Sequence, residues 1–504
     1  MSTLVSFLWH MHQPFYKDLA RQKYVMPWAY LHATKDYFGM PALVGEFPDV
    51  HQTFNLVPSL ILQIEEYARE EARDDMFDLA FKPVGALTAE DRNTIRDQFF
   101  PVPVRTMVEP FPRYLELHGK HLRKEAFSDA DILDTQVWWT LAWMDVDAGP
   151  KGLIEKQRDF TEDDKAHLKQ FALQLIRSVV PEYRKRQNAG SIEVSMSPFY
   201  HPILPLLMRS RVDDPNMPVD FMFPEDARAQ LVRARDFMTP RFGRKPIGIW
   251  PSEGSVSDEV VELAGSLGFK WMATDEGILA KGGVDRQYKP YGRHGVRLFF
   301  RDRTISDLIG FQYMKGAARD GAQDLIRRLK EKGDGAHVTI ALDGENPWDY
   351  YTNSGRDFLR YLFDGIQKDP GLEAITFAEA CERVPAEPLH WVAAGSWANA
   401  NFYIWAGHPE DHEAWRWIFR AREVLMAHKE AKQWDLAYEE LLIAEGSDWM
   451  WWFGNDFSSD QDAIFDSLFR QHIGNVFGFL GQPVPEDLAN PIKKSLEGRR
   501  SVML

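Results

Sequence analysis

The sequence predicts an α/β fold, a barrel of parallel strands followed by a helical C-terminal region. Three observations predict it: seven short apolar segments separated by longer helical ones, polar residues directly after those segments, and a change to helical segments alone after about residue 385. A chain of 504 residues, 44% of them hydrophobic, is long enough for one large barrel and an accessory domain.

Seven segments have the length and composition of buried strands, because each is short, apolar and rich in Val, Ile, Phe or Thr. They cover residues 4–9, 51–56, 191–197, 246–250, 269–274, 296–300 and 337–342. Charged segments with helical spacing separate most of them. Because alternation of strand and helix requires crossover connections, we expect the strands to pair in parallel as an α/β barrel.

The region between the second and third strands is far too long for one crossover connection. Residues 59–190 contain charged helical stretches around a Pro-rich connector, PVPVRTMVEPFP. We therefore expect a helical insertion there, within a catalytic barrel of residues 1–385. Residues 386–504 contain helical segments only, and we expect an α-helical domain that contributes to the active-site cleft.

Composition argues against several classes of partner. The 75 acidic and 59 basic residues give a net charge of −16, which would repel nucleic acid and anionic lipid headgroups. The single cysteine, Cys381, cannot form an internal disulfide. The apolar run at residues 4–9 has neither the flanks of a signal peptide nor the length of a membrane span. We expect a cytoplasmic protein without nucleic-acid or membrane partners; its oligomeric state stays open.

Polar residues follow the predicted strands. Since the carboxyl ends of parallel barrel strands meet on one face, these side chains should converge there. They are His10 and His12, Asn55, His201, Glu253, Asp275, Arg301 with Asp302, and Asp343 with Glu345.

Two of these strand ends place a carboxylate near a tryptophan, in WPSEGS around Glu253 and in LDGENPW around Asp343. Cleavage of a glycosidic bond needs one carboxyl group that protonates the leaving oxygen and a second, ionised one that faces the anomeric carbon. Tryptophan rings offer flat apolar faces to sugars. Both blocks have structural alternatives: Glu253 could cap a helix that begins near Ser257, and Asp343 could belong to a plain Asp-Gly turn.

His10 and His12 have the i, i+2 spacing that places both imidazoles on one face of a strand. They could hold a metal ion, with a third ligand from His201, Asp343 or Glu345, or they could bind sugar hydroxyls. The sequence contains no phosphate-binding loop, cysteine pair or serine-hydrolase elbow. We expect no cofactor, and we favour the sugar-binding role over a metal site.

Segment 444–459, AEGSDWMWWFGNDFSS, combines an acidic pair, Glu445 and Asp448, with three tryptophans at positions 449, 451 and 452. Three tryptophans within four positions cannot share one side of a helix. One interpretation is that the segment reaches the barrel mouth and supplies a stacking platform for sugar. The other is that its rings pack between domains.

Five blocks of the sequence, in their order, resemble the five motifs of glycoside hydrolase family 57. They are HQP at 12–14, EVSMSPFYHPILP at 193–205, WPSEGS at 250–255, LDGENPW at 342–348 and EGSDWMWW at 445–452. The stretch FFRDRTISDLIGF at 299–311 is also similar to family members. Within the family, DGENPWDYY and EGSDWMWWFGNDFSS are most similar to the α-amylase and amylopullulanase branch.

The resemblance implies an incomplete (β/α)7 barrel followed by a helical domain, and a retaining enzyme that acts on α-glucans. It implies Glu253 as the nucleophile, Asp343 as the general acid/base, and three histidines that line the glycosyl subsite. The expected substrate-binding residues are His10, His12, Gln13, His201, Trp250, Asp275, Arg301, Glu345, Trp348, Asp448 and Trp449.

We expect the negative charges of Glu253 and Glu345 to raise the pKa of Asp343, as a general acid requires. The substrate would be an α-glucan or a maltooligosaccharide. The same site could instead transfer a glucan chain to a sugar, as a 4-α-glucanotransferase or branching enzyme. A metal-dependent hydrolase built on His10 and His12, and a glucan-binding protein without turnover, are the alternatives from other classes.

Overall fold

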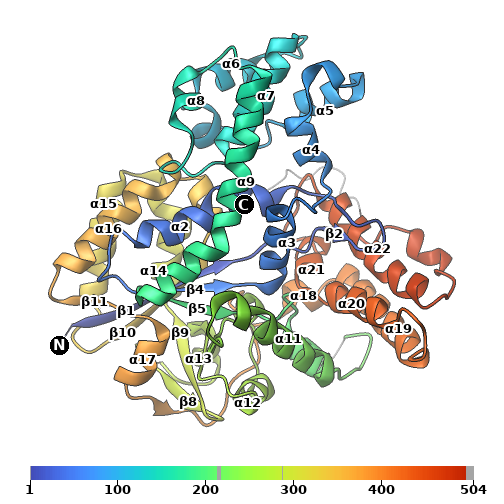
Figure 1. The fold of residues 1–504 in the computed structure, drawn as a ribbon. Helices are drawn as coiled ribbons and strands as arrows, with labels where there is room; N and C mark the ends of the chain where they lie inside the picture. The colour runs from blue at the N-terminus through green and yellow to red at the C-terminus, as the bar shows by residue number, and fades with distance from the viewer. Residues whose placement is uncertain (1, 213–216, 286–287, 495–504) are drawn as a thin grey trace.

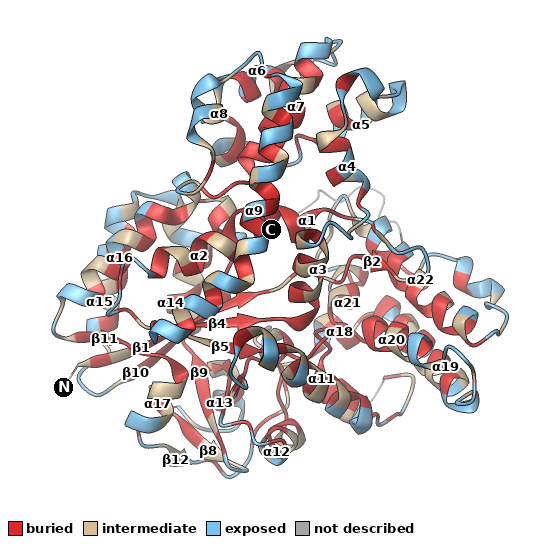
Figure 2. Cartoon of the chain, in the orientation of Figure 1, coloured by how far each residue is buried: buried red, intermediate tan, exposed pale blue. Residues whose placement is uncertain are grey.

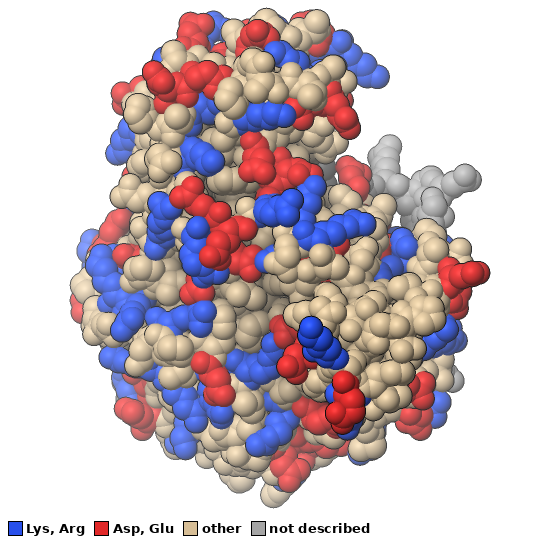
Figure 3. Space-filling view, turned by 45° about the vertical axis from the view of Figure 1, so that its right-hand side comes forward, with Lys and Arg blue, Asp and Glu red and all other residues tan. Residues whose placement is uncertain are grey.

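The computed structural model of the protein describes residues 2–212, 217–285 and 288–494. Figure 1 shows a central barrel, a helical lobe above it and a group of C-terminal helices beside it. Within the described ranges, no helix is both long and apolar enough to cross a membrane. Figure 3 shows basic and acidic side chains interspersed over the face in view.

Seven parallel strands form the barrel. They are β1 (Thr3–Met11), β4 (Gln52–Leu56), β5 (Ile192–Met196), β6 (Gly248–Ile249), β7 (Trp271–Asp275), β9 (Val296–Arg301) and β10 (His337–Asp343). Each pairs with the next in this order, and β10 pairs with β1. The pairing of Thr339 with Arg301 joins β10 to β9 and closes the ring. The predicted incomplete (β/α)7 barrel, with all seven predicted strands, is confirmed.

The paired part of β6 is shorter than the sequence predicts, because Pro251, which has no amide hydrogen, leads the chain into the 3-10 helix η3 (Ser252–Gly254). Five short strands are additional to the prediction. They are β2 (Lys17–Asp18) and β3 (Lys23–Tyr24), which form a hairpin, β8 (Tyr291–Arg293) antiparallel to β9, β12 (Glu387–Pro388) beside β8, and β11 (Leu372–Ala374) beside β1.

Helices connect the barrel strands and cover the outside of the barrel (Figure 1). They are α1 (Trp28–Thr34), α2 (Asp36–Val44), α10 (Leu204–Met208), α11 (Pro224–Phe242), α12 (Asp258–Ser266), α13 (Glu276–Lys281), α14 (Arg303–Asp307), α15 (Ala318–Lys330), α16 (Arg356–Lys368) and α17 (Phe377–Arg383). The loops after β9 and β10 contain the short helical turns η4 (Leu308–Gln312), η5 (Tyr313–Lys315), η6 (Asn346–Asp349) and η7 (Thr352–Gly355).

The predicted helical insertion lies between β4 and β5. It contains α3 (Pro58–Ala68), α4 (Asp75–Phe81), η1 (Val84–Ala86), α5 (Ala89–Gln98), η2 (Val104–Val108), α6 (Pro112–Leu122), α7 (Asp129–Ala142), α8 (Lys151–Lys156) and α9 (Glu162–Ala189). In Figure 1, α4 to α8 form the upper lobe, and the 28-residue α9 runs back to the barrel. Capping boxes at Thr88, Ser128 and Thr161 begin α5, α7 and α9.

The C-terminal helices are α18 (Tyr403–Ala406), α19 (Pro409–Ala427), α20 (Trp434–Ala444), α21 (Asp448–Phe453), α22 (Asp462–Phe479) and η8 (Glu486–Ala489). The helical region begins later than residue 386, where the sequence predicts it to begin. Residues 386–402 contain β12 and non-helical chain that packs on the barrel, since Gly395 pairs with Val256 in an antiparallel bridge. Residues 495–504 of the predicted domain, and residues 1, 213–216 and 286–287 of the predicted barrel, lie outside the described residues.

Apolar side chains fill the barrel, and its strands are buried along most of their length (Figure 2). Phe377 of α17 packs against Trp271 and Phe299, with ring centroids 4.6 and 4.9 Å apart. Glu193 of β5 points its carboxylate at the same cluster. It accepts hydrogen bonds from Trp271 Nε1 and from Ala378 N, each at 2.8 Å, and burial of the carboxyl group raises its pKa to about 7.

Glu193 should make the stability of the fold depend on pH. Because its pKa is raised on folding from 4.5 to about 7, its contribution is fully present below about pH 4.5 and is lost as pH rises through about 7. Glu193→Gln keeps an acceptor oxygen and should make the decrease in Tm between about pH 5 and about pH 8 smaller, as measured by thermal unfolding. The exposed Glu382→Gln is the control; a Glu193→Gln profile parallel to that of the wild type would contradict the assignment.

Candidate active site

Strand pairing sets which side chains lie side by side at the carboxyl end of the barrel. His10 of β1 lies opposite Asn55 of β4 on one side and opposite Asp343 of β10 on the other. Glu253 follows β6, which lies between β5 and β7 in the same ring. The predicted strand-end residues therefore share one rim, where the active sites of such barrels lie.

Glu253 lies in η3 with a left-handed backbone, at φ 58°. The Trp397 N–H donates to the Glu253 carbonyl oxygen at 3.0 Å, and the Trp397 indole donates to Glu253 Oε2 at 2.9 Å. A non-glycine residue in this conformation is strained by about 1–2 kcal/mol, so these two bonds help to hold the carboxylate in place. The helix-cap alternative is wrong, because Ser257 caps α12 by accepting a hydrogen bond from Val260 N.

His201 has the same left-handed backbone, at φ 58°, and is held in a similar way. The Ser447 N–H donates to the His201 carbonyl oxygen at 3.0 Å, and Ser447 Oγ lies 3.0 Å from His201 Nδ1. His201 Nδ1 also lies 3.8 Å from Glu253 Oε1. Each of these two strained residues is thus bound twice by one residue from the C-terminal part of the chain.

Asp343 ends β10 and accepts a hydrogen bond from Asn346 Nδ2 at 3.2 Å. The next N–H, of Gly344, donates to His10 O at 2.7 Å, so the Asp-Gly step continues the pairing with β1 and is not an isolated turn. Burial raises the pKa of Asp343 above 3.8, whereas Asn346, His12 and Arg301 lower it. The direction is as predicted, and desolvation is the largest cause.

The two carboxyl groups also repel each other when both are ionised. Burial raises the pKa of Glu253 well above 4.5, and the charges of Asp343 and then Asp448 raise it further, while the Trp397 indole lowers it. Two interacting carboxyl groups lose their protons in two steps, so a pH range exists in which one is protonated and the other ionised. A general acid and a nucleophile need that combination.

Three imidazole rings stack in the barrel mouth. The ring centroids of His12 and His201 are 3.9 Å apart, and His10 lies 5.1 Å from His201 and 5.6 Å from His12. His10 Nδ1 lies 2.7 Å from Asn55 Oδ1, and His12 Nε2 lies 2.7 Å from Asp448 Oδ1. Burial lowers the pKa of His10 to about 3 and that of His201 well below 6.5. These two rings are therefore neutral near pH 7 and can both donate and accept hydrogen bonds.

The donor set closest to a metal site in this mouth is His12, His201 and Asp448, whose ligand atoms lie within 4.8 Å of one another. An imidazole lone pair lies in the plane of the ring. His12 and His201 stack with only 27° between their planes, so both cannot direct a nitrogen at one ion without turning. His10, proposed as the metal partner of His12, is outside this set. The arrangement fits the binding of hydroxyl groups better than it fits an ion.

A second possible ligand set, outside the barrel mouth, consists of His32, Asp36 and Asp349. The ammonium group of Lys35 lies 2.6 Å from Asp349 Oδ1 and 3.1 Å from Asp36 Oδ2. A buried lysine thus already supplies the cation that these carboxylates need.

Glu345 and Gln13 lie behind the imidazoles and not on an open surface. Glu345 is 2% exposed and accepts a hydrogen bond from His12 N at 3.4 Å. Burial, and then the charge of Asp343, raise the pKa of Glu345 well above 4.5. Gln13 Oε1 accepts a hydrogen bond from the Tyr16 hydroxyl at 2.8 Å. Both side chains therefore support the segment that positions His12.

Asp275, fully buried at the end of β7, orients two arginines. Arg301 Nη1 and Arg303 Nη2 donate to its two oxygens at 3.2 and 2.5 Å. The Arg301 guanidinium lies 5.5 Å from the centre of a Trp397 ring, and its charge lowers the pKa of Asp343. Asp275 therefore acts as the counter-ion that places Arg301 beside the two catalytic candidates.

The three tryptophans predicted to bind substrate are enclosed by protein. Trp250 and Trp348 are 0% exposed and Trp449 is 1% exposed. Trp348 packs against Trp9 with centroids 5.9 Å apart, and its indole donates to Gly344 O. None of the three rings has an exposed face in this structure, and their role in binding sugar stays a prediction. They pack in the protein interior beneath the barrel mouth.

Segment 444–459 reaches the barrel mouth through Asp448, while its tryptophans pack against other rings, and the stacking platform stays a prediction. Helix α21 brings Asp448 to His12, while Trp449 packs internally against His472, with ring centroids 5.4 Å apart. Trp451 is half-buried and stacks on Phe457 at 4.4 Å.

Trp397 and Ser447 were missed by the sequence analysis, and Asn55 was noted without a role. Trp397 lies in a non-helical stretch, GSWANAN, that no motif marks; its only signal is a tryptophan between small residues after the last barrel helix. Ser447 lies next to Asp448 in the EGSDWMWW block, so that block was its signal.

The model of Glycosyl hydrolase family 57 matches residues 6–393, more than half of the chain. The chain belongs to this family. The predicted membership is confirmed, and the protein is an enzyme of a glycoside hydrolase family. No curated protein matches the sequence.

Solved structures of family 57 enzymes share the fold of this member. A family 57 branching enzyme from Pyrococcus horikoshii has a TM-score of 0.63 at 15% identity, covering 100% of this chain and 98% of that chain. The α-amylase AmyC from Thermotoga maritima has a TM-score of 0.60 at 14% identity, covering 95% and 93%. The 4-α-glucanotransferase from Thermococcus litoralis has a TM-score of 0.55 at 15% identity, covering 95% and 59%. At these identities the similarity shows the fold alone.

Removal of the Trp397 indole N–H should change the ionisation of Glu253. Trp397→Phe keeps an aromatic ring but removes a donor that stabilises the carboxylate, so the pKa of Glu253 should rise. The acidic limb of the profile of kcat/KM against pH should move about one unit to higher pH. Trp434→Phe, which removes an indole N–H in α20, is the control. An acidic limb that does not move would contradict this role for Trp397.

Proposed function

We propose that this family 57 enzyme cleaves α-glucans with retention of anomeric configuration, through a covalent glycosyl-enzyme on Glu253. The observation that carries the proposal is that Glu253 and Asp343 meet the same imidazole stack at one barrel mouth: Asp343 pairs with His10, and Glu253 Oε1 lies 3.8 Å from Nδ1 of His201, whose ring is 5.1 Å from that of His10. The family match and the fold shared with an α-amylase, a branching enzyme and a 4-α-glucanotransferase support the substrate class. We place the chain with the α-amylase and amylopullulanase branch, acting on maltooligosaccharides or longer α-glucans.

In the first step, Asp343 gives its proton to the glycosidic oxygen while Glu253 attacks the anomeric carbon and the glycosidic bond breaks. Oε1 is the attacking oxygen, because Oε2 accepts the hydrogen bond of Trp397. In the second step, Asp343 takes a proton from water, and the water oxygen attacks the anomeric carbon and releases Glu253. This double displacement needs carboxyl groups about 5–5.5 Å apart, closer than an inverting enzyme requires.

The stacked imidazoles bind the glycosyl unit at the reacting centre. His10 and His201 are neutral, and Nδ1 of each ring is already bonded, to Asn55 and to Ser447, so each can bind one sugar hydroxyl through Nε2. Because neither carries a charge, neither lowers the pKa of the acid that must hold a proton. Asp448 orients His12 in the same stack.

Transfer to a sugar acceptor is the second candidate, since a hydroxyl of another glucan can replace water in the second step. The fold shared with a branching enzyme and a 4-α-glucanotransferase favours it. We also propose a cytoplasmic location, because the single cysteine, Cys381, leaves the fold independent of disulfides.

Loss of either carboxyl group should stop catalysis. Glu253→Gln and Asp343→Asn should each lower kcat/KM on maltoheptaose more than about 1,000-fold without lowering Tm, while Glu382→Gln leaves both unchanged. With α-maltosyl fluoride, whose leaving group needs no protonation, Asp343→Asn should still form the glycosyl-enzyme and accumulate it. Mass spectrometry should find the maltosyl adduct on the peptide that contains Glu253. An adduct on another residue, or full activity of Glu253→Gln, would refute the nucleophile assignment.

The products formed from maltoheptaose separate hydrolysis from transfer. Hydrolysis should yield only shorter chains, and proton NMR taken early should show the new reducing ends in the α-configuration that a retaining enzyme produces. Chains longer than the substrate would show transfer instead, and new α-1,6 branch points would indicate a branching enzyme. β-anomers as the first products would contradict the retaining mechanism.

A further inference from the structure

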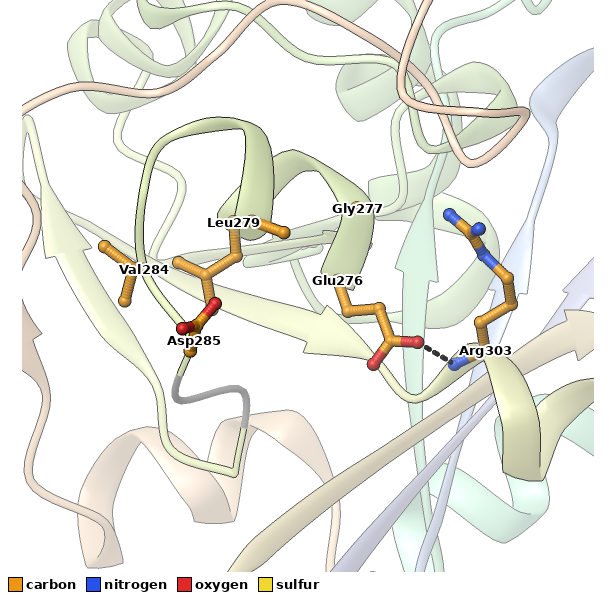
Figure 4. Close-up of a pocket in the computed structure, with 7 residues that line it drawn as sticks. Glu276, Gly277, Leu279, Val284, Asp285 and Arg303 are labelled. Atoms are coloured by element: carbon orange, nitrogen blue, oxygen red, sulfur yellow. Dashed lines mark hydrogen bonds between the residues drawn. The ribbon is translucent and has the colours of Figure 1, made fainter.

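A hollow of about 330 Å³ lies beside α13, on the outer part of the rim; we name it the α13 pocket (Figure 4). Its lining residues are Glu276, Gly277, Leu279, Ala280, Val284, Asp285 and Arg303. The volume is at the lower end of the range of about 300–1,000 Å³ for small-molecule sites, which suits one or two sugar rings.

The chemistry of the lining suits a neutral polyhydroxylated ligand. Val284, which is partly exposed, supplies apolar side-chain surface, and Glu276 and Asp285 supply carboxylate oxygens (Figure 4). The backbone N–H of Arg303 donates to Glu276 Oε1 at 3.3 Å. The charge of the Arg303 guanidinium is neutralised by Asp275. Two carboxylates disfavour an anion, whereas sugar hydroxyl groups can donate to them and the faces of a pyranose can contact the apolar side.

The pocket lies on the arc of the rim between the two catalytic candidates. Helix α13 follows β7 and Arg303 follows β9, and the order in the ring is β6, β7, β9, β10, with Glu253 after β6 and Asp343 at the end of β10. Asp275 joins Arg303 to Arg301, and Arg301 lies over Trp397, the partner of Glu253. A continuous chain of contacts therefore connects the pocket to the nucleophile candidate.

The backbone of an exposed tryptophan lies beside the C-terminal end of α13. Trp391 is 54% exposed. Its carbonyl oxygen lies 4.0 Å from the position that a Cβ on Gly282 would take, and Gly282 lies in the sequence between the lining residues Ala280 and Val284. A large exposed aromatic ring beside a polar hollow is a common feature of sugar-binding surfaces, because it presents apolar area without a charge.

We propose that the α13 pocket, together with Trp391, binds a glucose unit distant from the cleaved bond in the same α-glucan chain. This inference rests on the proposed function, because it takes the α-glucan as the ligand. Glu276 and Asp285 accept hydrogen bonds from sugar hydroxyls, and Val284 and Trp391 contact the faces of the rings. The pocket thereby makes chain length a determinant of specificity.

Filling the pocket tests the proposal. Ala280 is exposed, so Ala280→Trp introduces an indole there without disturbing the core. The ratio of kcat/KM for maltoheptaose to that for maltotriose should fall about 10-fold, the size of one lost stacked contact, and Trp391→Ala should lower it in the same direction. Ala130→Trp on α7 and Tyr361→Ala on α16 are matched controls, because both positions are exposed and remote from the pocket.

The two proposals fail in different ways. A ratio that is unchanged in both pocket variants, in an enzyme that cleaves both substrates, would overturn the α13 pocket and leave the proposed function intact. A wild-type protein that cleaves neither substrate would overturn the proposed function instead. In that case titration calorimetry with maltoheptaose tests whether the α13 pocket binds glucan. Binding that is weakened by Ala280→Trp but not by Ala130→Trp supports the pocket. Binding that is absent, or equal in all variants, overturns it.

Discussion

Closure of the seven-stranded ring by β10 is the constraint on which the site depends. β10 pairs with β1 over seven successive residue pairs, from Leu4 with His337 to His10 with Asp343, and it meets β9 at Thr339. A shift of one residue in this register would turn every side chain of β10 to the opposite face. Asp343 is therefore held at the rim by an entire strand. β6 has only two paired residues, so strand pairing alone does not hold Glu253.

The C-terminal part of the chain supplies the contacts that hold Glu253 in place, which the short strand β6 does not provide. Trp397 and Ser447 each use a backbone N–H and a side chain to bind one residue with φ near +58°, Glu253 and His201 respectively. Left-handed backbone in a non-glycine residue persists only where the surroundings hold it. The position of the nucleophile candidate is thus set by contacts between segments about 140 residues or more apart in sequence, which explains why the barrel needs the chain that follows it.

The barrel could be predicted because its evidence is local: each strand is a short apolar run, and each carboxylate directly follows one. Trp397 and Ser447, which hold Glu253 and His201, could not be predicted, because they reach the rim only through the tertiary arrangement. The burial of the tryptophans could not be predicted for the same reason. Trp250 and Trp348 each lie near a carboxylate in the sequence, yet both side chains face the interior. The direction of such a side chain depends on its position in the strand or on the path of the loop, and sequence spacing does not specify either.

The mouth must keep one carboxyl group protonated and the other ionised at the same rim. Burial raises the pKa of both Glu253 and Asp343, and the repulsion between their charges opposes ionisation of both at once. The Trp397 indole counteracts this at Glu253, where charge is needed. At Asp343 the nearest permanent cation, Arg301, is itself paired with Asp275 and Asp307, which limits how strongly it draws the proton away. The neutral rings of His10 and His201 bind polar groups without adding a charge beside the two carboxyl groups, so burial, mutual repulsion and these hydrogen bonds together set the ionisation of the pair.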